Sequence, residues 1–209
     1  VESIRPLAGG RWQVTASVNE TAATEQADAV IYAAPAHAWA AIAERSSELA
    51  PALESLTRVE HPPVAVVALG YRREQVAHAL DGFGLLVPAV ERRRVLGVLF
   101  PSSLFPDRAP SGHVLLTTFV GGARQPELAR QDQQALRTMV HAELRDLLGV
   151  EGLPVETFGV VWPQAIPQYT LGYGRTRSAL AAAETIHPGF TSAGTFRDGI
   201  SVGDALASG

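Results

Sequence analysis

The strands near the two ends of the 209-residue chain restrict its fold more than any other feature. Residues 27–35 read ADAVIYAAP, a continuously apolar run that ends at a proline. Such a run is typical of a strand that is buried on both faces, as in a parallel sheet. Residues 190–196, FTSAGTF, predict a second buried strand, followed by a glycine-containing bend and a helix that begins within ISVGDALASG. We therefore expect the two ends to form a layer that differs from the middle of the chain.

The middle of the chain is rich in strand patterns and carries one clear helix. The valine-rich residues 62–71 and the residues 112–122 predict strands, and two shorter strands flank the charged turn at 91–94. Residues 126–150 predict a helix, since one face collects Leu128, Leu136, Met139, Val140, Leu144 and Leu147. The sequence therefore predicts an α+β fold, in which a strand-rich domain lies under covering helices.

The composition argues against several classes of function. Apolar residues make up 46% of the chain and charged residues 18%, which allows a sizeable core. The net charge is -4 and the one basic run is short, so we expect no nucleic-acid partner. The lack of cysteine excludes disulfides, thiolate catalysis and cysteine-bound zinc. The chain does not begin with Met and shows no signal-peptide pattern, and we expect it to be a piece of a longer protein.

The usual catalytic motifs are incomplete. Residues 199–203 match G-x-S-x-G, in which Ser201 would be a nucleophile at a strand-to-helix turn. The histidine of such a triad follows the serine, but the last histidine here is His187, so Ser201 lacks a base. The other histidines are scattered, and we expect no metal site. GFG at 82–84 and GYG at 172–174 lack the third glycine of a nucleotide-binding loop.

The segment at 190–209 is the strongest candidate for a site. The first turn of its helix presents unpaired N–H groups that carry a partial positive charge. Gly199, Ser201 and Gly203 are small and let a flat ligand approach the backbone. This arrangement suits an electron-rich ring edge, such as the pyrimidine of a flavin. An ordinary strand-to-helix corner explains the same residues equally well.

Four stretches occur together in a specific order: DGFGLLVP at 81–88, TTFVGG at 117–122, VWPQAIPQYTLGY at 161–173 and AGTFRDGISVGDALASG at 193–209. In order and spacing they resemble the protoporphyrinogen oxidase family, the FAD-dependent enzymes of haem biosynthesis. The resemblance implies that residues 1–36 and 188–209 are parts of a Rossmann-like FAD-binding domain. It also implies that residues 37–187 form the substrate-binding domain.

The resemblance also implies roles for single residues. For the FAD cofactor these are Val1 on the adenine side, Trp162 beside the isoalloxazine, and the backbone of Ile200, Ser201 and Val202. For the substrate, Phe83 and Leu86 would clamp the tetrapyrrole and Phe119 would lie above its ring. No charged catalytic residue is implied. Plain core packing stays an alternative for Phe83, Leu86, Phe119 and Trp162. We expect the aromatic rings of residues 160–174 to lie beside the slot that would hold the flavin and the tetrapyrrole.

The implied reaction is the oxidation of protoporphyrinogen IX or coproporphyrinogen III to the porphyrin, with dioxygen as acceptor. Hydride would pass from a methylene bridge to flavin N5. The resemblance favours a cytoplasmic enzyme and leaves open peripheral contact with the inner face of the membrane and a homodimer. Two alternatives remain: a related flavin amine oxidase or desaturase, and an inactive fragment, because the family's GxGxxG loop is not in this sequence.

Overall fold

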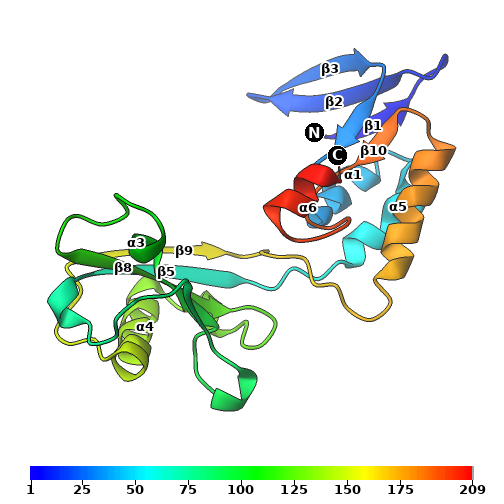
Figure 1. Ribbon diagram of the computed structural model, residues 1–209. Coiled ribbons are helices and arrows are strands. Elements are labelled where there is room, and N and C mark those ends of the chain that lie inside the picture. The colour runs from blue at the N-terminus through cyan, green and yellow to red at the C-terminus, as the bar shows by residue number, and fades with distance from the viewer. Residues whose placement is uncertain (209) are drawn as a thin grey trace. The chain divides into compact units, whose positions relative to one another are not determined.

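An antiparallel five-stranded sheet organises the middle of the chain (Figure 1). The computed structural model describes residues 1–208, apart from the side chains of Val18 and Ala52. Contacts divide the chain into two compact units, one of Val1–His61 with Ile166–Gly209 and one of Pro62–Ala165. The described helices and strands together confirm the predicted α+β class. No helix of residues 1–208 is both long enough and apolar enough to cross a membrane.

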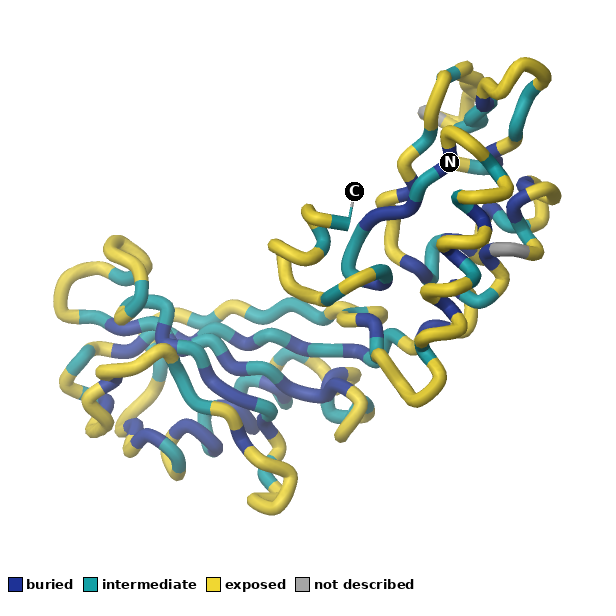
Figure 2. The backbone as a smooth tube through the Cα atoms, turned by 45° about the vertical axis from the view of Figure 1, so that its right-hand side comes forward, coloured by how far each residue is buried: buried dark blue, intermediate teal, exposed yellow. Residues whose placement is uncertain are grey.

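The sheet of the unit Pro62–Ala165 has the strand order β6-β7-β8-β5-β9. Its strands are β5 (Val64–Arg72), β6 (Gly84–Leu86), β7 (Gly97–Leu99), β8 (His113–Gly121) and β9 (Glu156–Trp162). Burial alternates along β5 and β8, as Figure 2 shows, because successive side chains point to opposite faces. Short helical turns complete the unit: η3 (Arg73–Gln75), η4 (Ala89–Glu91), α3 (Pro101–Leu104) and η5 (Leu128–Arg130).

The helix α4 (Gln133–Leu148) covers one face of this sheet (Figure 1). Its apolar stripe joins one core with the inward residues of β5 and β8: Leu136, Met139, Val140, Leu144 and Leu148 from the helix, and Ala65, Val67, Leu69, Tyr71, Leu116 and Val120 from the strands. The helix is shorter than predicted, because Asp132 Oδ1 accepts a hydrogen bond from the Ala135 N–H at 2.8 Å and starts it there. Leu128 therefore lies outside it, in η5.

The other unit holds two small sheets. The strands β1 (Ser3–Pro6), β2 (Trp12–Val18) and β3 (Thr21–Ala27) form an antiparallel meander. The strands β4 (Val30–Tyr32) and β10 (Phe190–Ser192), from the two ends of the chain, pair in parallel. The sequence predicted a strand buried on both faces at β4, but Ile31 is 60% exposed. Its exposure follows from the open apolar groove that Ile31 lines, because side chains point to the faces of a sheet and the groove leaves this face uncovered among the described residues.

Helices and helical turns complete this unit. They are η1 (Ala36–Trp39), α1 (Ala40–Ala43), α2 (Ala50–Leu53), η2 (Glu54–Arg58), α5 (Gly174–Ile186) and α6 (Val202–Ala207). Among them, α5 contacts β10. The shared core includes Trp12, Trp39, Leu53, Leu180, Phe190 and Phe196. The rings of Tyr32 and Trp39 meet edge to face, with centroids 5.3 Å apart.

The compact units differ from the predicted domain boundaries at 36/37 and 187/188. Residues 37–61 and 166–187 lie in the unit with the chain ends, because Trp39, Leu53 and Leu180 belong to the same core as Phe190. A helical pattern in the sequence does not reveal which sheet the helix covers. The assignment of one unit to FAD and the other to the substrate stays a prediction.

We predict that Leu144→Ala lowers the free energy of unfolding by about 2–5 kcal/mol, because it leaves a cavity between α4 and the sheet. Urea unfolding measures this loss. Leu153→Ala is the matched control, since Leu153 is 77% exposed in the same unit, and its effect should stay within about 0.5 kcal/mol. Equal losses in the two variants would contradict the packing described here.

Candidate functional site

The bend between β10 and α6, residues 193–201, is the terminal corner. Ala193 N–H donates to the Tyr32 carbonyl at 3.0 Å and extends the pairing with β4. Gly194 has a φ of +125°, which favours glycine, and its N–H donates to Ser208 Oγ at 2.9 Å. The Arg197 N–H closes a turn on the Gly194 carbonyl at 3.0 Å. The terminal corner is therefore a defined turn, held at both of its ends.

Ser201 starts the helix α6. Its Oγ accepts a hydrogen bond from the Asp204 N–H at 3.0 Å and donates to Asp204 Oδ2 at 2.7 Å. Gly199 makes room for this cap, since a Cβ there would lie 2.3 Å from Asp204 Oδ2. The Ser201 hydroxyl is thus engaged in a cap.

The three predicted backbone ligands of the flavin lie on the outer side of the terminal corner. Ile200 is 53% exposed, Val202 is 78% exposed, and Ser201 is also exposed. Among residues 1–208, the N–H groups of Ile200, Ser201 and Val202 have no hydrogen-bond acceptor. The corner therefore presents exposed apolar side chains together with free backbone donors.

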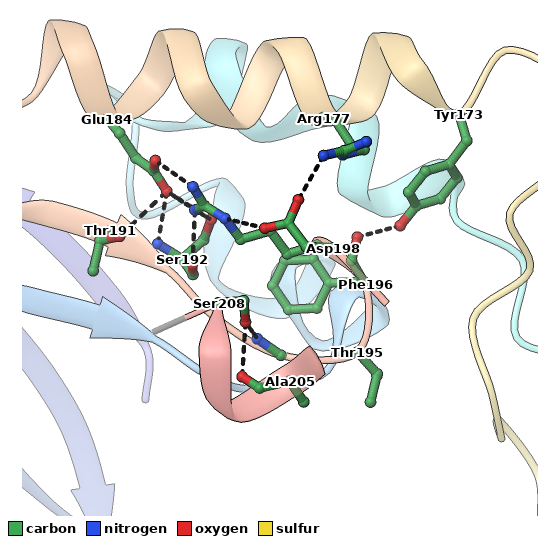
Figure 3. Close-up of polar contacts among 12 residues, drawn as sticks. Tyr173, Arg177, Glu184, Thr191, Ser192, Thr195, Phe196, Asp198, Ala205 and Ser208 are labelled. Atoms are coloured by element: carbon green, nitrogen blue, oxygen red, sulfur yellow. Dashed lines mark hydrogen bonds and ion pairs between the residues drawn. The ribbon is translucent and has the colours of Figure 1, made fainter. Parts of the chain in front are cut away.

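The inner side of the terminal corner is bound to the segment that precedes α5. Tyr169 and Tyr173 stack with ring centroids 4.2 Å apart and an interplanar angle of 22°. The Tyr169 hydroxyl donates to the Thr195 carbonyl at 2.7 Å, and the Tyr173 hydroxyl donates to the Phe196 carbonyl (Figure 3). Two rings of the irregular segment 160–174 thus lie against this corner.

Polar side chains of α5 bind the same side of the corner. Arg197 pairs with Glu184 through both terminal guanidinium nitrogens, Nη1 and Nη2, and Nη2 lies 2.9 Å from Glu184 Oε2 (Figure 3). Glu184 Oε1 also accepts from the Ser192 N–H at 2.9 Å. Asp198 bridges Arg197 Nε at 3.0 Å and Arg177 Nη2 at 2.8 Å. Burial alone would raise the pKa of Glu184, but the hydrogen bonds from Arg197 and Ser192 outweigh it and lower that pKa.

The predicted substrate residues lie on the sheet face opposite α4. The strand registers place Leu86 beside Gly97, Gly97 beside Phe119, and Phe119 beside Val66, which in turn lies beside Val160. Opposed residues of an antiparallel pair point to the same face, so these residues form one apolar row across five strands. We call it the open-face row. Leu86 is 88% exposed and Phe119 is half-buried.

Two further residues flank the open-face row. Trp162 lies opposite Val64 on the same face and is 56% exposed, so it does not pack on α4. Phe83 precedes β6, is 67% exposed, and its carbonyl accepts from the Phe100 N–H at 3.1 Å. Leu86, Phe119 and Trp162 therefore share one face, and their exposure argues against the core alternative for Leu86, Phe83 and Trp162.

An ion-pair cluster holds the β6–β7 connection, which follows Leu86, against α4. Glu143 is 5% exposed, and its carboxylate accepts from Arg94 Nε at 2.8 Å and from Arg93 Nη1 at 3.4 Å. Arg124 Nη1 also donates to the Val87 carbonyl at 2.9 Å. The edge strand that carries Leu86 is thereby fixed, although it has only three residues.

Val1 lines an apolar groove in the same unit as the terminal corner. Val1 is 66% exposed, and the groove has a volume of about 600 Å³ and lining residues that include Ile4, Val30, Ile31 and Ile42. Ile200, Ser201 and Val202 do not line this groove. The roles predicted for Val1 on the adenine side and for Ile200–Val202 at the flavin ring stay predictions.

A family model described as "Flavin containing amine oxidoreductase" matches residues 1–209. The chain belongs to this family. Membership confirms the predicted flavin cofactor class and the predicted oxidoreductase class. It also agrees with the free backbone donors at Ile200–Val202, because flavins are electron-rich at one ring edge.

Members of the flavin amine oxidoreductase family that resemble this chain include porphyrinogen oxidases. A mitochondrial protoporphyrinogen oxidase of Nicotiana tabacum is 42% identical over 160 residues, which are 75% of this chain and 32% of the relative. The coproporphyrinogen III oxidase of Bacillus subtilis is 28% identical over 190 residues, which are 89% of this chain and 39% of the relative. These matches confirm the resemblance to protoporphyrinogen oxidase that the four sequence stretches indicated.

A solved structure of the same kind supports the fold. A proposed protoporphyrinogen oxidase from Exiguobacterium sp. 255-15 superposes with a TM-score of 0.77 at 20% identity, over 99% of this chain and 43% of that chain. This chain thus spans less than half the length of these relatives.

Sequence reasoning missed the residues that hold this family member's terminal corner. Tyr169 and Tyr173 were expected near the site only as apolar rings, and Glu184 and Arg197 were not singled out. The available signal was the spacing of two tyrosines four residues apart in a segment too irregular to form a strand. Phe158, 63% exposed opposite Ala68 on the open face, was also missed.

We predict that Gly199→Ala lowers the free energy of unfolding by about 1–2 kcal/mol, because the new Cβ displaces Asp204 from the cap of α6. Thermal unfolding measures the loss. Gly203→Ala is the matched control, since its Cβ would lie 3.7 Å from Ser201 Oγ, an ordinary contact, and alanine favours the helix. A Gly199→Ala variant as stable as Gly203→Ala would count against this cap.

The Glu184 contact predicts a pH dependence of stability. Because the folded-state pKa of Glu184 is below its ordinary value of 4.5, its contribution is present above that pH and is lost as the pH falls through the folded value. The difference in unfolding free energy between the wild type and Glu184→Gln should therefore be largest at neutral pH and shrink in acid. A Glu184→Gln difference that grows in acid would disprove the sign.

Proposed function

We propose that this chain supplies the flavin-contacting corner and the substrate face of an FAD-dependent porphyrinogen oxidase. The reaction is the oxidation of protoporphyrinogen IX or coproporphyrinogen III to the porphyrin, with dioxygen as acceptor, in haem biosynthesis. The observation that carries the proposal is the open-face row, a flat apolar surface with exposed Leu86 at one end and half-buried Phe119 near its middle. The names of the tobacco and Bacillus relatives support the substrate class.

The terminal corner fits a flavin. Ile200, Ser201 and Val202 carry no charged group, and their free N–H groups can donate to a ring edge. Such donors stabilise the negative charge that a flavin gains on reduction. The chemistry that FAD supplies when bound is the acceptance of hydride at N5 and its passage to dioxygen. Trp162 on the sheet face and Val1 beside its groove are proposed as further cofactor contacts.

The chain's own residues would act by placement. Leu86, Phe83 and Phe119 offer apolar surface to the macrocycle, and its burial against them excludes water from the reacting bridge. Glu143 and its arginine partners keep the strand of Leu86 in position. No side chain of the open-face row is ionisable, so placement and water exclusion, not proton transfer by that row, are the expected contributions.

The proposal includes a cytoplasmic enzyme, with peripheral membrane contact and homodimer formation as properties to be measured on the complete protein. An amine oxidase is the second candidate, because the matching family is described as one of amine oxidoreductases. The apolar open-face row favours the porphyrinogen over a small amine.

The direct test mixes flavin-loaded protein that contains this chain with each substrate in the absence of oxygen. Protoporphyrinogen IX or coproporphyrinogen III should bleach the flavin absorbance in one two-electron step, and a simple amine should not. The porphyrin requires the loss of six electrons, so it should form only over repeated cycles once oxygen is readmitted. Readmission of oxygen should restore the absorbance. Bleaching by the amine alone would replace the proposal with the amine oxidase, and protein without flavin absorbance would refute both.

We predict that Leu86→Ala raises the KM for the porphyrinogen about tenfold, because burial of a leucine side chain is worth about 1.5–3 kcal/mol. Steady-state kinetics measures this, and stability should change little because Leu86 is 88% exposed. Leu153→Ala is the control with the same substitution at another exposed site. An unchanged KM in Leu86→Ala would remove Leu86 from the substrate surface.

A further inference from the structure

The terminal corner is bound on one side and free on the other. Four side chains from residues 169–184 contact four consecutive corner residues. Tyr169 binds the carbonyl of Thr195. Tyr173 binds the carbonyl of Phe196, Glu184 the guanidinium of Arg197, and Arg177 the carboxylate of Asp198 (Figure 3). After these residues and Gly199 come Ile200–Val202, which are exposed and whose N–H groups have no acceptor in the described chain.

The two tyrosines hold backbone atoms and not side chains. A hydroxyl bonded to a carbonyl fixes the peptide plane that follows, and Tyr169 and Tyr173 do this for adjacent peptides. Their stacked rings also limit each other's rotation. The pair therefore sets the path of the backbone at residues 195–197, directly upstream of the free donors.

The ion pair fixes the same corner against β10. Arg197 Nη1 donates to the Ser192 carbonyl at 2.8 Å and to Ser192 Oγ at 2.8 Å, while Glu184 accepts from Ser192 as well. The side chains of Arg197 and Glu184 are only 21% and 19% exposed. A planar guanidinium with two carboxylate contacts tolerates little displacement. Ser192, just before the turn, and Arg197, at its end, are thus both held to Glu184 on α5.

The tyrosine contacts come in addition to an anchor that the turn already has in the core. Phe196 is 1% exposed and already anchors the turn in the core. A hydrogen bond from a residue as exposed as Tyr169, at 42%, adds little to folding. Ligand-holding groups, in contrast, need placement to within about 0.5 Å. Side chains hold one side of the corner, and its other side carries free N–H donors. This arrangement is expected where side chains position backbone groups that bind a ligand.

We propose that Tyr169, Tyr173, Glu184 and Arg197 are positioning residues that hold the N–H groups of Ile200–Val202 at the flavin. This inference rests on the proposed function, since it requires FAD at the terminal corner. None of the four touches the reacting atoms; they act through the backbone of the corner. Because donors to the ring stabilise the reduced flavin most, their misplacement weakens binding of reduced FAD more than that of oxidised FAD.

The test compares FAD dissociation constants of the holoenzyme in both redox states. Tyr169→Phe and Tyr173→Phe keep the stacked rings and remove only the hydroxyls. Each should weaken oxidised FAD about threefold and reduced FAD about thirtyfold, and this tenfold difference corresponds to a reduction potential lower by about 30 mV. Arg197→Lys, which keeps the charge but loses the planar fork, should act in the same direction.

Tyr71→Phe is the matched control. It removes a tyrosine hydroxyl that contacts His141 Nδ1 at 2.9 Å in the other unit, so it costs stability without touching the terminal corner. Its FAD dissociation constants should equal those of the wild type. Unchanged constants in both corner variants, equal weakening in both redox states, or a matching effect of Tyr71→Phe would overturn the inference while wild-type FAD binding still supports the proposed function. A wild type that binds no FAD would overturn both.

Discussion

The parallel pairing of β4 with β10 is the constraint on which the rest of the structure depends. It joins Val30 with Phe190 and Tyr32 with Ser192, residues from opposite ends of the chain. Everything between them must leave this pair and return to it, so residues 62–165 are an insertion that folds on its own sheet. The pairing also delivers the chain directly into the terminal corner, because Ala193 continues the contact with Tyr32.

The two units use different physics for the two tasks assigned to them. The terminal corner presents backbone donors, and hydrogen bonds and the Glu184–Arg197 pair hold its position. The open-face row presents apolar surface, and its arrangement depends on the register of five strands and on the core packed against the other face. Glu143 and Leu144, adjacent on α4, illustrate the second case: one anchors the β6–β7 connection and the other fills the core.

Local patterns in the sequence predicted the elements better than their assembly. The apolar period of residues 126–150 identified α4, although the Asp132 cap shortens it, and alternation identified β5 and β8. The helices at 36–58 and 174–186 share a core with the chain ends, and no local pattern indicates this, because contacts such as Tyr32 with Trp39 are decided by the global fold.

The site residues also fall into those that the sequence pointed to and those that only the assembled fold reveals. Leu86, Phe119 and Trp162 were selected by resemblance, and the strand registers place them on one face. The bonds from Tyr169 and Tyr173 to the terminal corner link residues more than twenty positions apart, and no local pattern reports a hydroxyl that meets a carbonyl at that distance along the chain.

The short strand β4 has one further consequence. Within the described residues its second edge meets no strand, and the apolar groove of about 600 Å³ runs beside Val30 and Ile31. A strand with an open row of peptide groups is a template for any extended segment that reaches it. This chain, when produced alone, is therefore expected to self-associate through that edge. Keeping it in solution as single molecules would require the edge to be covered.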